Sequence, residues 1–220
     1  MTRAALFIDF DGTISPVDIS NTFFTRFAGP DAVRAVEEWK RGLISSSECL
    51  ERELAAYEGD IERLREFAGD QNIDPGFKGL LGECLRRGVD VRVVSDGLDF
   101  YIEAFFDRHG LDVSLSSNRL LVTPRGPKLE FPYRNPECGA CGNCKSSHVE
   151  RAKRDGKFIV YVGDGLSDRC AAGKADLVFA KGALRAYCEE RDIPHVAFDN
   201  LGQVAEHLRS TDIGIPIAGR

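Results

Sequence analysis

Three short segments rich in apolar residues, each ending in a polar stretch that contains Asp-Gly, restrict the fold of this chain more than any other feature. With their polar ends they are residues 6–12, 89–97 and 158–165. Segments with helical spacing of apolar residues alternate with these runs. Strands that are apolar on both faces and alternate with helices are typical of a parallel sheet covered by helices on both sides. We therefore expect an α/β fold with a Rossmann-like parallel sheet.

The segment after the first run has a different character. Residues 16–77 carry helical patterns throughout, and no strand pattern interrupts them. From residue 78 onward strand and helix patterns alternate, apart from an irregular hairpin expected near residues 115–133. The sequence thus predicts a core domain made of residues 1–15 and 78–220. It also predicts a small helical cap domain, residues 16–77, inserted after the first strand.

Composition limits the partners. The 220 residues can hold one full core and a modest second lobe, and 43% of them are hydrophobic. The net charge of −6 argues against a nucleic-acid binder, which normally shows a basic footprint. No apolar run approaches the ~20 residues that span a bilayer, and the apolar start is too short for a secretory signal. We expect a cytoplasmic monomer or homodimer that binds neither nucleic acid nor membrane.

Aspartates gather at the predicted strand ends, where open parallel sheets bind ligands. Asp9 and Asp11 stand two residues apart, so they point the same way from the first strand. Two carboxylates ~4 Å apart repel by about 4 kcal/mol at an effective dielectric of about 20. A cation must offset this repulsion if Asp164 and Asp168 join them, and Lys145 and a divalent metal are the candidates. The alternative is an exposed strand end with two solvated acids.

This set of residues suits phosphoryl transfer. Asp9 is the candidate nucleophile, because a carboxylate can form an aspartyl-phosphate intermediate. Asp11 is the candidate general acid and base. Asp164 suits Mg²⁺, with Asp9 and the backbone carbonyl of Asp11 completing a set of oxygen ligands. Asp168 would be a second or water-mediated ligand.

The remaining candidates would hold the phosphate. The hydroxyl of Ser95 and the backbone amides of Gly12 and Gly97 can donate to phosphate oxygens. Lys145 would bridge the phosphate and Asp9. Four acids and a phosphate dianion put about six negative charges in one place, so the substrate should not bind without the metal.

Four segments resemble the four motifs of haloacid-dehalogenase-superfamily phosphatases, in the order of that family. They are Asp9-Phe10-Asp11-Gly12-Thr13, Val94-Ser95-Asp96-Gly97, Lys145 and Gly163-Asp164-Gly165-Leu166-Ser167-Asp168. The resemblance covers most of the chain. It implies the family's core fold, a Mg²⁺-dependent phosphatase reaction through an aspartyl phosphate, and for the matched positions the roles given above.

A finer resemblance is to the phosphoserine-phosphatase-like branch, which has a helical cap after the first motif. Within it the chain is similar to the methionine-salvage phosphatases that act on 2-hydroxy-3-keto-5-methylthiopentenyl-1-phosphate. The matching stretches are residues 42–45, 95–100 and 175–180 and the cysteines before Lys145. Phosphoethanolamine and phosphocholine phosphatases are similar around residues 144–145 and 161–165. The resemblance implies the methionine-salvage substrate, with phosphoserine, phosphoethanolamine or phosphocholine as alternatives. Asp96 stands where many methionine-salvage members have glycine, so this acid is a candidate for altering substrate choice.

Two further groups of residues have competing interpretations. The spacing of Cys138, Cys141, Cys144 and His148 suits a zinc site, but reduced thiols or one disulfide fit it too. Asp18 lies just past the first motif, where an acid contacts the substrate amine in phosphoserine phosphatases. It is equally suited to cap the helix that follows it.

Two other functions share these residues. A phosphomutase would use the same nucleophile and acid but return the phosphate to the substrate. A receiver-type signalling module would keep the phosphate on Asp9 as its signal. Asp11 and Lys145 argue against the signalling module, because Asp11 would shorten the life of the phosphorylated form.

Overall fold

The computed structural model describes residues 4–210, and their contacts divide the chain into two compact units. The first unit consists of the described residues of Met1–Pro16, Ile73–Val94 and Lys145–Arg220. The second consists of Val17–Asn72 and Ser95–Cys144. The predicted division into a core (1–15 and 78–220) and a cap (16–77) stays a prediction about separate domains.

A parallel sheet forms the centre of the first unit. Its strands are hydrogen-bonded in the order β2-β1-β5-β6-β7. Strand β1 is parallel to both of its neighbours, and Phe7 pairs with Arg92 on one side and Tyr161 on the other. The bounds of the five strands are β1 Ala4–Ile8, β2 Asp90–Leu98, β5 Phe158–Gly163, β6 Leu177–Ala180 and β7 Val196–Ala197. The predicted α/β fold with a parallel sheet is confirmed.

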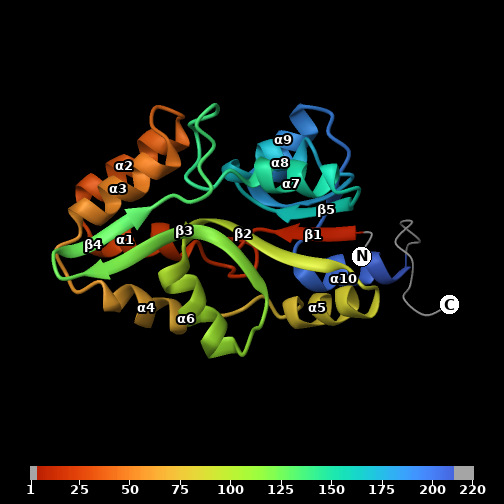
Figure 1. The fold of residues 1–220 in the computed structure, drawn as a ribbon, viewed down its shortest axis with the longest axis horizontal. Coiled ribbons are helices and arrows are strands. Elements are labelled where there is room, and N and C mark those ends of the chain that lie inside the picture. Colours follow the sequence, from red (N-terminus) through yellow and green to blue (C-terminus); the bar gives the residue numbers. More distant parts are fainter. Residues whose placement is uncertain (1–3, 211–220) are drawn as a thin grey trace. The chain divides into compact units, whose positions relative to one another are not determined.

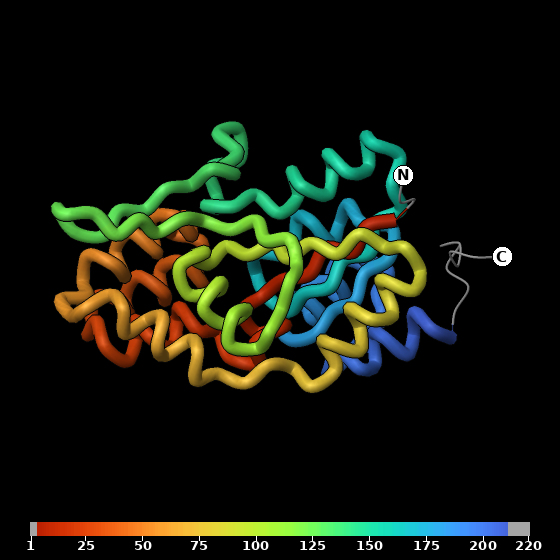
Figure 2. Tube along the Cα trace, turned by 60° about the horizontal axis from the view of Figure 1, so that its bottom comes forward, coloured from red at the N-terminus to blue at the C-terminus, as the bar shows by residue number. Residues whose placement is uncertain are grey.

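Helices cover both faces of this sheet (Figure 1). On one face lie α5 and α10, which Figures 1 and 2 both show side by side. On the other face lie α7, α8 and α9. The bounds are α5 Phe77–Arg86, α7 Lys145–Arg154, α8 Arg169–Ala172, α9 Gly182–Glu190 and α10 Leu201–Ser210, with a 3₁₀ turn, η1, at Leu166–Asp168.

The buried residue Asp74 joins the starts of α5 and α10. Its Oδ1 accepts hydrogen bonds from the backbone amides of Gly76 at 2.8 Å and Leu201 at 3.1 Å. Two segments of the backbone approach closely here, because a Cβ on Gly76 would lie 1.9 Å from the backbone nitrogen of Gly202. Side chains at position 76 are therefore excluded.

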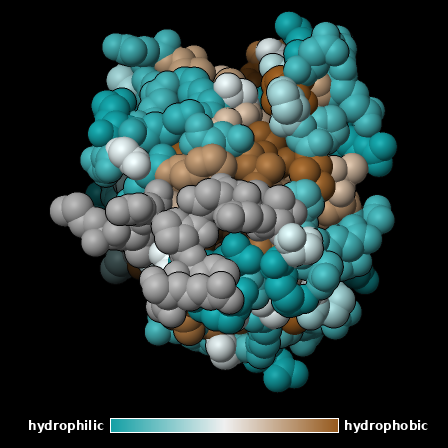
Figure 3. Space-filling view, turned by 90° about the vertical axis from the view of Figure 1, so that its right-hand side faces the viewer, coloured by the Kyte–Doolittle hydropathy of each residue, from teal (hydrophilic) through white to brown (hydrophobic). Residues whose placement is uncertain are grey.

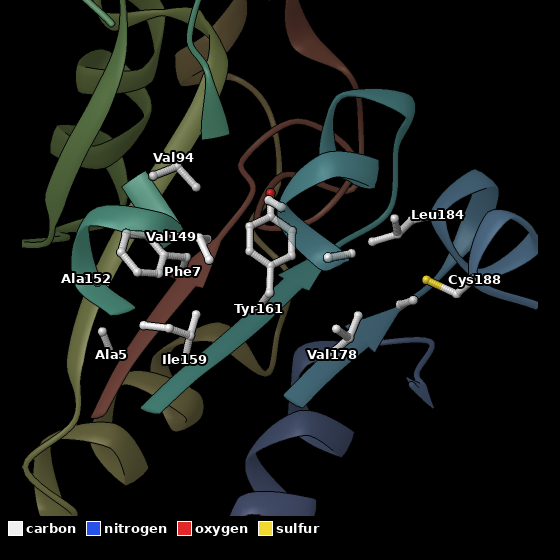
Figure 4. Packing of buried hydrophobic residues seen from close by; sticks show 13 residues of the cluster. Ala5, Phe7, Val94, Val149, Ala152, Ile159, Tyr161, Val178, Leu184 and Cys188 are labelled. Carbon is white, nitrogen blue, oxygen red and sulfur yellow. The ribbon is translucent and has the colours of Figure 1, made fainter. Parts of the chain in front are cut away.

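Apolar side chains fill the space between the sheet and the helices α7, α8 and α9. Figure 4 shows this cluster, in which Phe7 and Ile159 of the strands lie near Val149 of α7, while Leu184 and Cys188 of α9 lie at its other side. The strand residues of the cluster are almost wholly buried. This packing fixes the strands whose ends carry the predicted aspartates.

The second unit is mainly helical. It contains α1 (Ile19–Phe27), α2 (Pro30–Lys40), α3 (Ser46–Ala56), α4 (Glu62–Gly69) and α6 (Asp99–His109). An aromatic cluster packs helix α1 against helix α4, and the ring centroids of Phe23 and Phe67 lie 5.7 Å apart. The predicted hairpin is present as the antiparallel pair β3 (Ser114–Thr123) and β4 (Gly126–Glu130).

One strand boundary differs from the prediction. The sequence indicated a strand over residues 89–94 with Ser95-Asp96-Gly97 as its polar end, whereas β2 includes these residues and continues to Leu98. The reason is that β3 lies next to β2 in the sheet order β4-β3-β2, so residues 95–98 are held in a strand that the polar residues alone would not predict.

The surface is polar, as the charged content of 29% implies. On the face shown in Figure 3, hydrophilic side chains (teal) surround a smaller hydrophobic area (brown). Among residues 4–210, no helix has the length and apolar character needed to cross a membrane.

Candidate active site

Asp9 follows directly after β1 and is held at the end of the sheet. Its backbone amide donates to the carbonyl of Val162 at 2.9 Å, which continues the pairing of β1 with β5. Its carboxylate is almost wholly buried. The Oδ1 atom accepts a hydrogen bond from the amide of Phe10 at 2.7 Å. The sheet therefore fixes both the position of Asp9 and the direction of its carboxylate.

A tight turn follows Asp9 and brings the chain against Asp164. The amides of Thr13, Ile14 and Ser15 all donate to the carbonyl of Phe10, at 2.9 to 3.1 Å. The half-buried Asp11 lies within this turn, which is closed by a bridge from Asp11 to Ser15. The hydroxyl of Thr13 donates to Oδ1 of Asp164 at 2.8 Å.

Gly12 makes this approach possible. Its φ of +77° lies in the left-handed region that glycine tolerates and other residues rarely adopt. A Cβ at this position would lie 2.4 Å from Oδ2 of Asp164. The sequence motif thus needs glycine for two separate reasons, its backbone conformation and its missing side chain.

Lys145 joins two of the acids. It is the first residue of α7, and only 2% of its surface is exposed. Its Nζ lies 2.6 Å from Oδ1 of Asp9 and 2.7 Å from Oδ1 of Asp168. Burial favours the neutral amine, but the charges of Asp168 and Asp9 raise the pKa of Lys145 above its usual range. Lys145 therefore stays charged and pairs with both acids at once.

Asp168 is surrounded by donors from the chain itself. Oδ1 accepts from Nζ of Lys145 at 2.7 Å and from the hydroxyl of Tyr161 at 2.6 Å. Oδ2 accepts from the backbone amides of Asp164 at 3.1 Å and Gly165 at 2.9 Å. An ionised carboxylate has about four acceptor positions, so these four donors occupy them. Asp168 thereby holds Lys145 and the turn that carries Asp164.

The three aspartates make a set of ligands that fits a hard divalent cation. Asp9, Asp164 and Asp168 each offer a carboxylate oxygen, and these atoms lie within 4.8 Å of one another. Oxygen ligands of this kind are those that Mg²⁺ prefers. Donors of the chain occupy the acceptor positions of Asp168, and the predicted contacts of Asp9 and Asp164 with a cation stay predictions. The predicted role of Asp168 as a second or water-mediated ligand stays a prediction too.

The electrostatics of the site show that it lacks positive charge. Burial, followed by the charge of Asp168, raises the pKa of Asp9 well above its usual range, against the opposing effect of Lys145. Burial and Asp168 likewise raise the pKa of Asp164 to about 6. Burial also acts on Asp168, but the charge and hydrogen bond of Lys145 hold its pKa below the usual value. Three acids thus share one lysine, which is the deficit that a cation would offset.

The predicted residues Ser95, Asp96 and Gly97 are consecutive and lie in the second unit. The Ser95 hydroxyl accepts a hydrogen bond from the amide of Gly97 at 2.9 Å, so these two candidates contact each other. Oδ1 of Asp96 accepts from the amide of Asn143 at 2.8 Å and from Nδ2 of Asn118 at 3.1 Å. These bonds give Asp96 a structural task within its unit. The predicted phosphate and substrate roles of all three residues stay predictions.

Asp18 caps a helix, which is one of its two predicted roles. Its Oδ1 accepts from the amide of Asn21 at 2.9 Å at the start of α1. Its predicted contact with substrate stays a prediction.

The cysteines give no support to a zinc site. All seven lie within residues 4–210, and none of them forms a disulfide there. Within that range Asp9, Asp164 and Asp168 form the group of close ligand atoms that fits a metal, and Cys138, Cys141, Cys144 and His148 are not part of it. Burial lowers the pKa of His148 to about 4, and the nearby Arg151 and Arg92 add to this effect.

Two residues of the site had no role in the sequence prediction. Thr13 was recognised as part of a motif, but its hydrogen bond to Asp164 joins residues 151 positions apart, which one sequence does not reveal. Tyr161 read as an apolar strand residue. One feature of the sequence could have revealed it: among residues 158–162, Tyr161 is the residue whose side chain has a polar atom.

The family of the chain follows from a match of its sequence. Residues 6–173, which include Asp9, Lys145 and Asp164, match the haloacid dehalogenase-like hydrolase family. The chain belongs to this family. The match confirms the family predicted from the four motifs, and phosphatases of the family use Mg²⁺.

Curated relatives with similar sequences share one name. A protein of Exiguobacterium sibiricum named 2-hydroxy-3-keto-5-methylthiopentenyl-1-phosphate phosphatase is 29% identical over 219 residues, which cover 93% of this chain and 96% of that protein. A protein of Lysinibacillus sphaericus with the same name is 26% identical over 227 residues, which cover 97% of this chain and 99% of the relative.

Solved structures support the fold. A structure titled as a phospho-aspartyl intermediate analogue of phosphoserine phosphatase has a TM-score of 0.70 at 22% identity, covering 96% of this chain and all of that one. A haloacid dehalogenase family hydrolase of Salmonella enterica has a TM-score of 0.73 at 17% identity, covering 96% of this chain and 72% of that one. The predicted phosphoserine-phosphatase-like fold is confirmed.

Proposed function

We propose that this chain is a Mg²⁺-dependent phosphatase that hydrolyses 2-hydroxy-3-keto-5-methylthiopentenyl-1-phosphate through a phosphorylated Asp9. The hydrolase family and the phosphatase names of relatives that match almost the whole chain support a phosphatase. The observation that carries the mechanism is the ion pair between Lys145 and Asp9, beside Asp164 and Asp168, at the end of the sheet. The names of the relatives support the choice of substrate.

In the first step Asp9 attacks the phosphate ester. Among residues 4–210, Nζ of Lys145 and the amide of Phe10 each contact Oδ1 of this carboxylate. We therefore assign Oδ2 as the atom that forms the new bond to phosphorus. The bond between phosphorus and the ester oxygen breaks, and Asp11 gives its proton to that oxygen.

In the second step water attacks the phosphorylated Asp9. The deprotonated Asp11 takes a proton from the water, and the oxygen of the water binds phosphorus. The bond between Oδ2 and phosphorus breaks, which releases inorganic phosphate and restores Asp9 and the protonated Asp11. Asp11 is suited to both steps because it is half-buried in the turn next to Asp9.

The other residues bind and orient the phosphate. Asp9, Asp164 and the backbone carbonyl of Asp11 would hold Mg²⁺. When bound, a divalent cation supplies positive charge that favours the ionised carboxylates and offsets the charge of the phosphate. Lys145 keeps Oδ1 of Asp9 in place, and the amide of Gly12 can donate to a phosphate oxygen. The predicted phosphate contacts of Ser95 and Gly97 stay predictions, and in the second unit the Gly97 amide donates to the Ser95 hydroxyl.

A comparison of phosphate esters tests the proposal. Phosphate release is measured with the methionine-salvage ester, phosphoserine, phosphoethanolamine and phosphocholine, each with Mg²⁺ and after chelation. We expect the methionine-salvage ester to have the highest kcat/KM and Asp9→Asn to abolish release from every ester. A higher kcat/KM with another ester would show that this other ester is the preferred substrate. An isomerised ester without free phosphate would make the enzyme a mutase.

A further inference from the structure

A buried tyrosine lies beneath the candidate site. Tyr161 belongs to β5, where its neighbours in the sequence are apolar, and none of its surface is exposed. Figure 4 shows its ring packed in the apolar cluster, with the hydroxyl oxygen on the side facing away from Ile159 and Val178. Burying a hydroxyl is unfavourable unless it is hydrogen-bonded. Phenylalanine would serve the packing alone, so the hydroxyl needs another explanation.

The hydroxyl contacts a carboxylate that is itself fully buried. It donates to Oδ1 of Asp168 at 2.6 Å, within the range of short hydrogen bonds to ionised carboxylates. The direction is fixed, because the ionised Asp168 has acceptors only. Such charge-assisted bonds are about twice as strong as bonds between neutral groups.

Asp168 in turn holds residues that are proposed to take part in the reaction. The same Oδ1 accepts from Lys145, whose Nζ also contacts Asp9. Oδ2 holds the amides of Asp164 and Gly165. Without the hydroxyl of Tyr161, one acceptor position of a buried carboxylate would be empty, and the side chain could turn about its bonds. Lys145 and the turn with Asp164 would lose their common support.

We propose that Tyr161 is a positioning residue of the phosphatase reaction, whose hydroxyl fixes Asp168 and through it Lys145 and Asp164. The inference rests on the proposed function. According to this inference, a residue in the interior of the sheet serves the site although it touches neither substrate nor metal. Tyr161 acts by keeping the ion pair of Lys145 with Asp9, and the carboxylate of Asp164, in one arrangement.

The variant Tyr161→Phe tests the proposal, because it keeps the ring and removes only the hydroxyl. Tyr187→Phe is the matched control: Tyr187 lies in the same unit, and its ring packs against the guanidinium of Arg169 at 4.8 Å, a contact that phenylalanine retains. Melting temperature, kcat and KM for p-nitrophenyl phosphate, and calorimetric binding of Mg²⁺ to the metal-free protein are measured for both variants.

We expect Tyr161→Phe to fold and to lower both kcat and Mg²⁺ affinity about tenfold or more, the usual scale when a residue that orients a metal site without touching the metal is removed. KM should change less than kcat, and Tyr187→Phe should match the parent. An unchanged kcat and Mg²⁺ affinity in Tyr161→Phe would overturn the proposal. So would a loss of melting temperature that leaves the folded fraction fully active.

A double variant separates positioning through Asp168 from any other role. If Tyr161 acts through Asp168, adding Tyr161→Phe to Asp168→Asn should lower kcat by much less than it does in the parent. Equal effects in both backgrounds would contradict the proposed route. If the parent protein releases no phosphate from any ester, the proposed function fails. If the parent is active and Tyr161→Phe equals it, only the inference about Tyr161 fails.

Discussion

Replacing Gly12 by alanine should separate two demands that the structure makes at one position. The first is its φ of +77°, which costs an alanine about 1–2 kcal/mol. For a chain of this size that lowers the melting temperature by about 2–8 °C. The second is the contact of the new Cβ with Oδ2 of Asp164, placed at 2.4 Å.

The size of the second effect follows from that distance. Real Cβ atoms essentially never come closer than 3.0 Å to another heavy atom, so Asp164 or the turn must move by at least 3.0 − 2.4 = 0.6 Å. A displacement of about 1 Å at a reacting centre can lower a rate about 100-fold. We expect Gly12→Ala to lose activity on this scale and to bind Mg²⁺ more weakly, because Asp164 is a proposed ligand.

Gly156→Ala supplies the matched control. Gly156 follows α7 in the same unit and has a φ of +75°, but a Cβ there would meet no atom within 4 Å. Melting curves, kcat for p-nitrophenyl phosphate and calorimetric Mg²⁺ binding are compared for both variants. They should lose similar melting temperature, and only Gly12→Ala should lose activity and metal affinity. Equal activity in the two variants would refute the close approach of Gly12 to Asp164.

Three further predictions concern single contacts. Thr13→Val removes the hydrogen bond that lowers the pKa of Asp164, so calorimetry at pH 7 should show weaker Mg²⁺ binding, and Thr13→Ser should restore it. Burial raises the pKa of Asp164 to about 6, and a protonated carboxylate does not bind metal, so Mg²⁺ affinity should fall as the pH drops below about 6. A constant Mg²⁺ affinity from pH 7 to pH 5 would contradict this prediction. Arg87→Met breaks the buried ion pair with Glu83 at 2.7 Å and should lower the free energy of unfolding, measured in urea melts, by about 3 kcal/mol. This is the low end of such losses, because Arg86 also pairs with Glu83, and kcat should stay that of the parent.

The sheet and the position of Asp9 were predictable from the sequence because they depend on local patterns. An apolar run followed by Asp9 and Asp11 indicates a strand end without knowledge of any partner. The contact of Lys145 with Asp9 was expected because neighbouring carboxylates need a cation to offset their repulsion. The four family motifs in order made this part of the prediction specific.

The residues that sequence reasoning missed depend on contacts between distant parts of the chain. Tyr161 looked like one more strand residue, and only the fold shows that its hydroxyl reaches Asp168. The end of β2 was predicted too early, because its last residues are held by pairing with β3 rather than by their own preference. Asp18 fitted both a helix cap and a substrate contact, and its hydrogen bond to Asn21 establishes the cap.

The central claim is that Asp9 carries the phosphoryl group between substrate and water. The most direct measurement mixes the protein and Mg²⁺ with a phosphate ester labelled at phosphorus, quenches the mixture in acid within one turnover, and locates the label by peptide mapping. We predict hydroxylamine-sensitive label on Asp9 in the parent and none in Asp9→Asn or after chelation. Rapid phosphate release with no label on Asp9 at any time within the turnover would contradict the account.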